Sequence, residues 1–152
     1  MNVRDQPLVI VAGRGIGPFL LGLGRNEVHA LTREPIHSYF PQEWSTVRSD
    51  AHDSIGVTVS YDDDGHANHI AGYTRLKYGK SMLELEGERL RDTTRASLIL
   101  LLDLLETPHE DTGETVLAPA LALTFGFREP DAGSEYGPED PVDWVVVRPL
   151  TS

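Results

Sequence analysis

Two seven-residue segments of this chain match each other in residue character at every position. Ile55 to Tyr61 and Leu121 to Phe127 both run large, small, large, Thr, large, small, aromatic. Alternation of large and small side chains is typical of a β-strand with one buried face. Each segment follows a stretch with helical signals and precedes a turn-rich, acidic stretch and another β-prone run. The match therefore predicts one α+β unit that is used twice.

The other elements fit two such units. Helices are predicted over residues 26–33, ending before Pro35, and from Asp92 or Thr93 to about Glu106. Strands are predicted over residues 8–12, 19–21, 55–61, 69–76, 77–86, 116–127 and 142–147.

The chain has the length of one domain, 152 residues. We therefore predict an α+β fold in which two tandem helix-plus-antiparallel-sheet units, residues 8–76 and 77–149, pack as one compact domain over 1–152. Residues 36–53 are expected to be irregular. Their aromatic residues are expected to anchor them to the core: Tyr39, Phe40 and Trp44.

The second predicted helix is unusually rich in leucine. One face, at i, i+3, i+4 and i+7, is formed by Leu98, Leu101, Leu102 and Leu105, and three apolar residues lie outside it: Ile99, Leu100 and Leu104. A helix that is apolar on more than one side is buried in a core or in an interface. We favour a core helix, with a dimer interface as the alternative.

The charge of the chain is strongly acidic and uneven. The net charge is −11, and residues 77–152 hold 15 acids against 7 Lys or Arg, whereas residues 1–76 hold 9 against 6. Because nucleic-acid binding depends on Lys and Arg meeting phosphates, this balance argues against a nucleic-acid partner. It favours a basic protein partner for the second half, with simple solubility as the alternative.

Composition also bears on location. The chain has no Cys, no apolar run of about 18 residues, and an N-terminus without the pattern of a secretory signal. We expect a cytoplasmic protein with no membrane span.

Motifs for nucleotide binding or hydrolysis are incomplete. The loop from Gly13 to Pro18 starts like a dinucleotide fingerprint, but Pro18 or Leu20 stands where the third glycine belongs, so we interpret it as a structural turn. The Asp-rich stretch from Asp62 to Gly65 also reads as a hairpin turn. A metal site built from nearby oxygen and imidazole ligands is the alternative, with these candidates: His52, Asp53, Asp62, Asp64, His66 and His69.

The acidic loop that precedes the last strand is the stronger functional candidate. Aromatic residues supply contact area at interfaces, and surrounding carboxylates select basic partners. The residues predicted to bind a partner are Glu129, Asp131, Glu135, Tyr136, Glu139, Asp140, Asp143 and Trp144. A mobile, solvated loop is the alternative.

The segment Leu21 to Pro35 resembles the helix-entry motif of the outer-membrane assembly lipoprotein family and of the related β-lactamase-inhibitor-like fold. The matching residues are Leu21, Gly22, Glu27, Val28, Leu31 and Pro35. Glu27 can reach back to the N–H of Gly24, as in half of a capping box. The chain departs from the pattern at Gly24 and Arg33, and it has no lipoprotein Cys. The resemblance implies a tandem α+β repeat that binds protein, and it implies no catalytic residue.

Together these observations predict a small acidic cytoplasmic protein that binds another protein without catalysis and without a cofactor. An immunity-type, toxin-neutralising protein is its most concrete form. Two alternatives remain open: a metal-dependent enzyme that uses the His and Asp residues at 52–69, and an intracellular binder of a small ligand in the concavity of the sheet.

Overall fold

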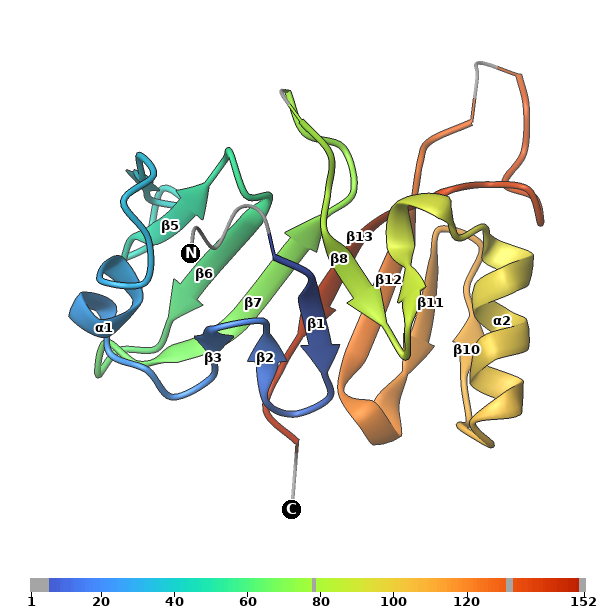
Figure 1. Ribbon diagram of the computed structural model, residues 1–152, viewed down its shortest axis with the longest axis horizontal. Coiled ribbons are helices and arrows are strands. Elements are labelled where there is room, and N and C mark those ends of the chain that lie inside the picture. The colour runs from blue at the N-terminus through green and yellow to red at the C-terminus, as the bar shows by residue number, and fades with distance from the viewer. Residues whose placement is uncertain (1–5, 78, 131–132, 151–152) are drawn as a thin grey trace.

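A computed structural model describes residues 6–77, 79–130 and 133–150. In this part of the chain the protein consists mainly of two β-sheets, with two short α-helices and two turns of 3-10 helix (Figure 1). The strands are β1 (Leu8–Val11), β2 (Gly15–Ile16), β3 (Phe19–Leu20), β4 (His37–Tyr39), β5 (Ser49–His52), β6 (Val57–Tyr61), β7 (Ala67–Tyr73), β8 (Leu83–Leu85), β9 (Glu88–Arg89), β10 (Glu110–Asp111), β11 (Thr115–Ala118), β12 (Leu123–Phe127) and β13 (Val142–Val147). The helices are α1 (Arg25–His29), η2 (Leu90–Asp92), α2 (Arg95–Leu104) and η3 (Pro119–Leu121).

The larger sheet is antiparallel throughout and has the strand order β10-β11-β12-β13-β7-β6-β5-β4. Its central pair is β7 and β13, in which Ile70 lies opposite Val147 and Tyr73 lies opposite Trp144. Strands β4 to β7 lie on one side of this junction and β10 to β13 on the other. The sheet is therefore two consecutive four-stranded meanders joined at their last strands.

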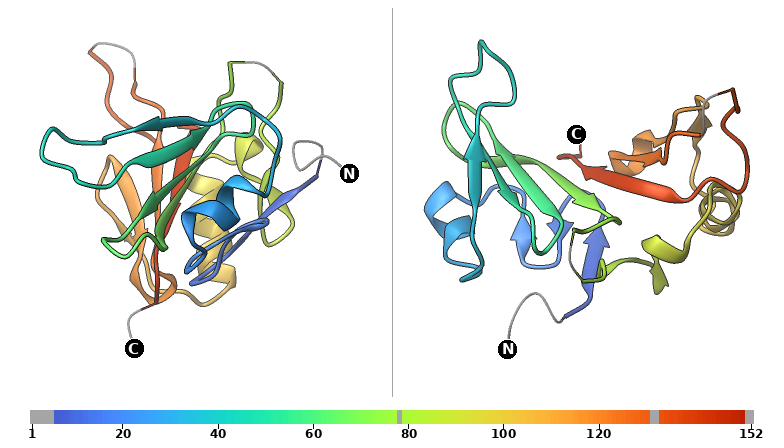
Figure 2. Two further views of the ribbon diagram at one scale, coloured as in Figure 1. Left: turned by 90° about the vertical axis from the view of Figure 1, so that its left-hand side faces the viewer. Right: turned by 90° about the horizontal axis from the view of Figure 1, so that it is seen from above.

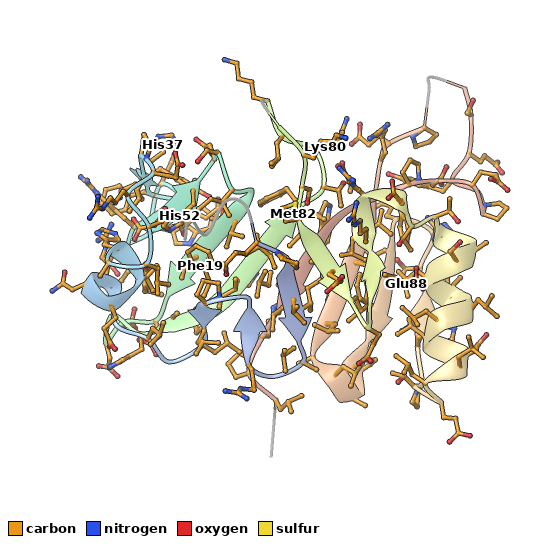
Figure 3. All side chains as sticks on the ribbon, in the orientation of Figure 1. Phe19, His37, His52, Lys80, Met82 and Glu88 are labelled. Atoms are coloured by element: carbon orange, nitrogen blue, oxygen red, sulfur yellow. The ribbon has the colours of Figure 1, made fainter. Side chains whose placement is uncertain are left out.

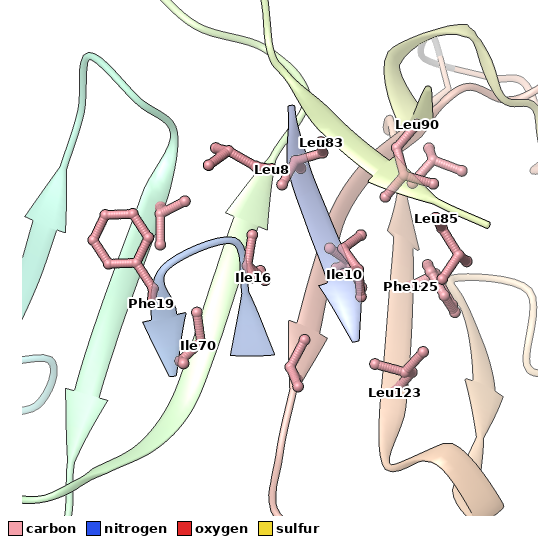
Figure 4. Packing of buried hydrophobic residues seen from close by; sticks show 14 of the residues in the cluster. Leu8, Ile10, Ile16, Phe19, Ile70, Leu83, Leu85, Leu90, Leu123 and Phe125 are labelled. Atoms are coloured by element: carbon pink, nitrogen blue, oxygen red, sulfur yellow. The ribbon is translucent and has the colours of Figure 1, made fainter. Parts of the chain in front are cut away.

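The smaller sheet, β3-β2-β1-β8-β9, covers the middle of one face of the larger sheet (Figure 1). Its strands β1 and β8 pair in parallel. Buried side chains from both sheets form the core between them (Figure 4). Gly72 on β7 permits this packing, because a Cβ there would lie only 2.7 Å from Cδ2 of Leu83 and 3.1 Å from Cδ1 of Ile16.

The predicted α+β fold of two tandem helix-plus-antiparallel-sheet units is wrong, because strands form both layers and the helices are small. The first helix ends at His29, since Val28 is its one buried residue and little apolar surface supports a longer helix. The second helix ends at Leu104, and Glu106 adopts a left-handed φ of 53°. Among the described residues, no helix has the length and apolar character needed to cross a membrane.

The starts of the two helices are capped differently. At α1 the Gly24 N–H donates to Oε1 of Glu27 at 3.0 Å, which confirms the predicted half of a capping box. At α2 the cap is Thr94, one or two residues later than predicted, and its side chain accepts from the N–H of Ser97.

The leucines of α2 are divided between the core and the solvent. Leu98 and Leu102 are fully buried, whereas Leu100 is 60%, Leu104 73% and Leu105 40% exposed. The prediction that α2 is buried on more than one side is therefore wrong for this chain on its own, and one side of the helix is an exposed apolar surface.

Residues 36–53 are not irregular, because they contain the edge strand β4 and its neighbour β5. All four residues of β5 are buried. Two of the predicted core anchors are instead exposed, Phe40 by 49% and Trp44 by 79%, since they lie in the connection between these outermost strands. Tyr39 is partly buried.

The two matched segments lie on β6 and β12, each the third strand from an end of the larger sheet. The ring that ends each strand lies beside a guanidinium from the first residue of a helix. Cζ of Arg25 is 5.8 Å from the Tyr61 ring centroid, and Cζ of Arg95 is 4.1 Å from that of Phe127. The match therefore reflects how these two strands pack, and the repeat boundaries at 8–76 and 77–149 stay a prediction.

The glycine loop from Gly13 to Pro18 contains the short strand β2 and connects β1 to β3. Gly13 and Gly17 have φ values of 71° and 55°, which favour glycine. The loop thus forms two tight turns, as interpreted from the sequence.

Candidate functional site

The acidic loop between β12 and β13 is bonded to the start of α2. The N–H of Arg95 donates to the carbonyl oxygen of Asp140 at 2.9 Å, and the N–H of Ala96 donates to that of Pro138 at 3.0 Å. Within the loop, the N–H of Gly137 donates to Oδ2 of Asp140 at 2.6 Å. The second half of the loop is therefore held by the first turn of the helix.

The Arg95 side chain adds further hydrogen bonds to this attachment. Its guanidinium is 6% exposed and donates to Oδ1 of Asp111 at 2.5 Å, to the carbonyl oxygen of Gly137 at 3.2 Å, and to that of Gly113. It also lies over the Phe127 ring. A buried guanidinium is stable only when its donors are paired, and here carbonyl and carboxylate oxygens from two segments, the turn at Asp111 to Gly113 and the acidic loop, accept from it.

A groove of about 520 Å³ separates α2 from this loop. The helix contributes Ala96, Ile99, Leu100 and Asp103, and the facing side contributes Tyr136, Pro138 and Asp111. Ile99 and Tyr136 are partly buried, whereas Leu100 is 60% exposed. The groove thus combines apolar side chains with two carboxylates.

Tyr136 also lines a second hollow of about 490 Å³, on the face of the larger sheet that the smaller sheet does not cover. The Trp144 indole packs directly against Gly126 there, since a Cβ on that glycine would be 1.9 Å from Cε2 of the ring. Arg75 donates to Oδ1 and Oδ2 of Asp143 at 2.6 and 2.9 Å. We call the groove and this hollow together the Tyr136 surface.

The structure brings together four of the eight predicted partner-binding residues. Glu129, Tyr136, Asp143 and Trp144 line the second hollow. Glu135 and Glu139 are exposed on the loop, and Asp140 is engaged in holding it. Asp131 lies outside the described residues.

The α2 side of the groove was not predicted from the sequence. The leucines outside the predicted buried face of the helix, such as Leu100, are the signal that could have indicated it, because their exposure leaves an apolar surface beside the loop.

The electrostatic environment of the Tyr136 surface is acidic. Burial, followed by the carboxylates of Glu114, Glu129 and Asp140, raises the pKa of Tyr136, and Arg95 opposes them. The phenol is therefore neutral, and it is surrounded by negative charge that a cationic group could approach.

A polar cluster centred on Asp50 occupies the inner face of β5 and was missed from the sequence. Oδ1 accepts from Nη2 of Arg25 at 2.9 Å and from Oγ of Ser38 at 2.5 Å. Oδ2 lies 2.7 Å from Oη of Tyr61, 2.6 Å from Nε2 of His29 and 3.3 Å from Nε of Arg25. Asp50 is fully buried, and its partners come from α1, β4 and β6.

These bonds make Asp50 a structural carboxylate. Burial alone would raise its pKa, but the hydrogen bonds from Arg25, Ser38, Tyr61 and His29 outweigh burial and lower it. The Ser38 hydroxyl donates to Asp50 and not to His29, so the cluster lacks the nucleophile–base bond of a catalytic triad. The cluster ties α1 and the edge strand β4 to the larger sheet.

His52 lies two residues further along β5, on the same inner face, and its ring packs against Phe19 with centroids 4.9 Å apart (Figure 3). Neither ring nitrogen has a hydrogen-bond partner among the described residues. Burial lowers the pKa of His52, and this effect outweighs the opposing influence of Asp50. The imidazole is therefore neutral at physiological pH.

The predicted metal ligands do not gather. His52 lies inside and Asp53 is exposed, while Asp62, Asp64 and His66 belong to the turn between β6 and β7. Oδ1 of Asp62 accepts from the N–H groups of Asp64 and His66, as in the predicted hairpin turn. In the described ranges, no group of three or more His, Asp or Glu residues lies close enough to hold a metal ion.

The uncovered face of the larger sheet holds one more hollow, of about 560 Å³. Figure 2 (right) shows the smaller sheet and both helices on the other side of the larger sheet. Residues on this face include the cross-strand partners His37, Ala51, Thr58 and Ala71. The hollow is lined by polar and aromatic residues that include His37, Tyr39, Asp53, Tyr73 and Arg75.

No family model, curated protein or solved structure matches this chain. The resemblance of residues 21–35 to the lipoprotein and inhibitor-like motif is therefore untested, and the α+β repeat that it implied is contradicted by the fold.

Proposed function

We propose that this protein is a non-catalytic binding module for another protein, and that the Tyr136 surface is its contact site. The observation that carries the proposal is the groove of about 520 Å³ between α2 and the acidic loop. The loop that forms one side is already bonded to α2, so little conformational entropy is lost when a partner binds.

The composition of the surface supports a protein partner. Aromatic residues, here Tyr136 and Trp144, are enriched at the residues that contribute most to protein interfaces. The exposed Leu100 adds apolar area that contact would remove from water. Carboxylates surround these residues, and the net charge of −11 would accelerate association with a basic protein.

Neutralisation of a toxin by an immunity-type protein is the more specific form of this proposal. It rests on the acidic second half of the chain and on the preformed groove between α2 and the acidic loop. The product of a neighbouring gene, purified and mixed with this protein, would test that form directly.

The general proposal is tested by capture and native mass spectrometry. Immobilised protein should retain a basic protein from cells of its source at low salt and form a complex of defined stoichiometry with it. The Tyr136→Ala variant should lose the complex. A Trp44→Ala variant is the matched control, since Trp44 is 79% exposed in a different connection. Equal retention by both variants would place the contact elsewhere and refute the proposal.

The hollow of about 560 Å³ on the uncovered face of the larger sheet favours a second candidate function, the binding of a small ligand. Tyr39 and Tyr73 provide aromatic surface, and Asp53 and Arg75 provide charge. Native mass spectrometry of freshly purified protein should then show an added mass that a Tyr73→Ala variant loses. A single peak at the mass of the chain would count against this candidate.

A further inference from the structure

The exposed side of α2 carries an apolar stripe. Leu98 and Leu102 point into the core, and helical geometry places Leu100 on the opposite side. Ala96, Leu100 and Leu104 are spaced four residues apart and therefore form one line along the helix. Leu100 and Leu104 are among the most exposed large apolar residues that the structure describes. The stripe borders the groove, to which Ala96 and Leu100 belong.

The form of the stripe favours a helical partner. A partner strand would gain its affinity from main-chain hydrogen bonds at a sheet edge, but the main-chain groups of α2 are bonded within the helix. Contact with α2 must instead be made by side chains. Its ten residues rise by about 15 Å, a length that three turns of a second helix would cover.

The charges beside the stripe specify the partner further. Residues 95–114 contain five carboxylates, from Asp103, Glu106, Glu110, Asp111 and Glu114, and a single Lys or Arg, Arg95. That guanidinium is buried and already bonded to Asp111. A second copy of this chain would bring the same carboxylates together, which is unfavourable. Lysine or arginine on a partner would complement them.

We infer that α2 and Tyr136 form a docking groove for a cationic amphipathic helix of another protein. Aliphatic side chains of that helix pack on Leu100 and Leu104, and its flanking Lys or Arg residues pair with Asp103 and Glu106. The inference rests on the proposed function and adds the structural class of the partner segment.

The test uses the full chain and a synthetic probe: a peptide of about five helical turns with leucine on one face and lysine elsewhere. Binding is measured by fluorescence anisotropy. We expect Leu100→Asp to weaken binding by about tenfold or more. The matched control is Leu150→Asp, the same change at another exposed leucine, and we expect it to alter affinity by less than about twofold. Leu104→Asp repeats the test at a second exposed position.

The sign of the Leu100→Asp effect is informative. The substitution adds a negative charge, so a peptide held by general charge attraction alone would bind equally well or more tightly. That result would overturn the inference, as would equal binding of a peptide with glutamate in place of lysine. Self-association of the free protein that Leu100→Asp abolishes would also overturn it, because the occupant would then be a second copy.

The result of the peptide-binding test can be distinguished from the result of the capture experiment that tests the proposed function. If capture yields a partner that Tyr136→Ala loses, but the helical peptide does not bind, the protein-binding proposal stands and the helical inference fails. If the peptide binds with the expected Leu100 dependence, the inference is supported independently of the capture experiment.

Discussion

Replacement of Asp50 by alanine should be one of the most destabilising single changes in this protein, and the cause can be isolated. Five donor contacts converge on its two oxygens. Removal of one member of a buried ion pair typically costs about 3–5 kcal/mol. The Arg25 and His29 side chains are 35% and 37% exposed and can turn to water. The Tyr61 hydroxyl is buried and cannot, which costs about 1–3 kcal/mol. We therefore expect Asp50→Ala to lower the free energy of unfolding by about 3–4 kcal/mol.

A double-mutant cycle with Tyr61→Phe separates the unpaired hydroxyl from the other losses. In the wild type, Tyr61→Phe should destabilise by about 1.5 kcal/mol or more, because it removes a bond to a carboxylate. In the Asp50→Ala background the same change should be neutral or stabilising, since it removes a buried hydroxyl that has lost its acceptor. Urea unfolding followed by circular dichroism gives all four values, provided that the m-value stays constant. Equal destabilisation by Tyr61→Phe in both backgrounds would refute the reasoning.

The pH dependence provides a second measure of the same site. Hydrogen bonds lower the pKa of Asp50 in the folded state, so an unfolded chain binds a proton at a higher pH than the folded one. The stability that Asp50 contributes is therefore fully present above about pH 4, the unfolded pKa, and is lost as the pH falls below it. Asp50→Ala should lose less stability than the wild type on acidification below pH 4.

Three other substitutions test separate parts of the structure. Gly126→Ala should displace the Trp144 indole, lower the free energy of unfolding by about 1–3 kcal/mol and change the tryptophan fluorescence spectrum. The control is Gly137→Ala, whose added Cβ meets nothing within 4 Å and which should leave the spectrum unchanged. His52→Leu should raise the free energy of unfolding at neutral pH by about 1 kcal/mol, because it removes two unpaired buried nitrogens. Since burial lowers the folded pKa of His52, the part of the stability that depends on this neutral imidazole should be full above about pH 6.5 and should fall as the pH drops below it. Urea unfolding should show a smaller fall between about pH 6.5 and 5 for the variant than for the wild type. Arg95→Lys should release the acidic loop, because an ammonium cannot reach all the oxygens that the guanidinium contacts. Amide hydrogen exchange at Gly137 should then be faster than in the wild type. An unchanged exchange rate would contradict the role of Arg95 in holding the loop.

The strands with regular alternation were predictable, and the polar strands were not. The alternating segment Val57–Tyr61 and the valine-rich segment Val142–Val147 both lie within predicted strands. Strand β5, with the sequence Ser-Asp-Ala-His, has no such pattern. Its polar residues are buried because Asp50 meets donors from distant segments and Ser49 bonds to Ser60, and neither contact is visible in local sequence.

The candidate site was predictable on one side only. Tyr136 and Trp144 among carboxylates indicated an interface, and both line the second hollow. The contribution of α2 was not predicted, because Leu100 and Leu104 look like core residues until the position of the helix is known. Burial of a helix on one side depends on what the remaining chain covers, and here the second sheet and the loop leave the other side exposed.

The position of β13 has a consequence for synthesis on the ribosome. This strand is central in the larger sheet, yet it is the last of the described strands to be translated. Until it emerges, β7 and β12 each present an open edge, and such edges readily pair with other chains. Val147 must then find Ile70, 77 positions earlier, and contacts of this range form slowly. A nascent chain of this protein therefore exposes two separate parts of the larger sheet until β13 has emerged, and a ribosome that stalls before Val142 would leave a product inclined to aggregate.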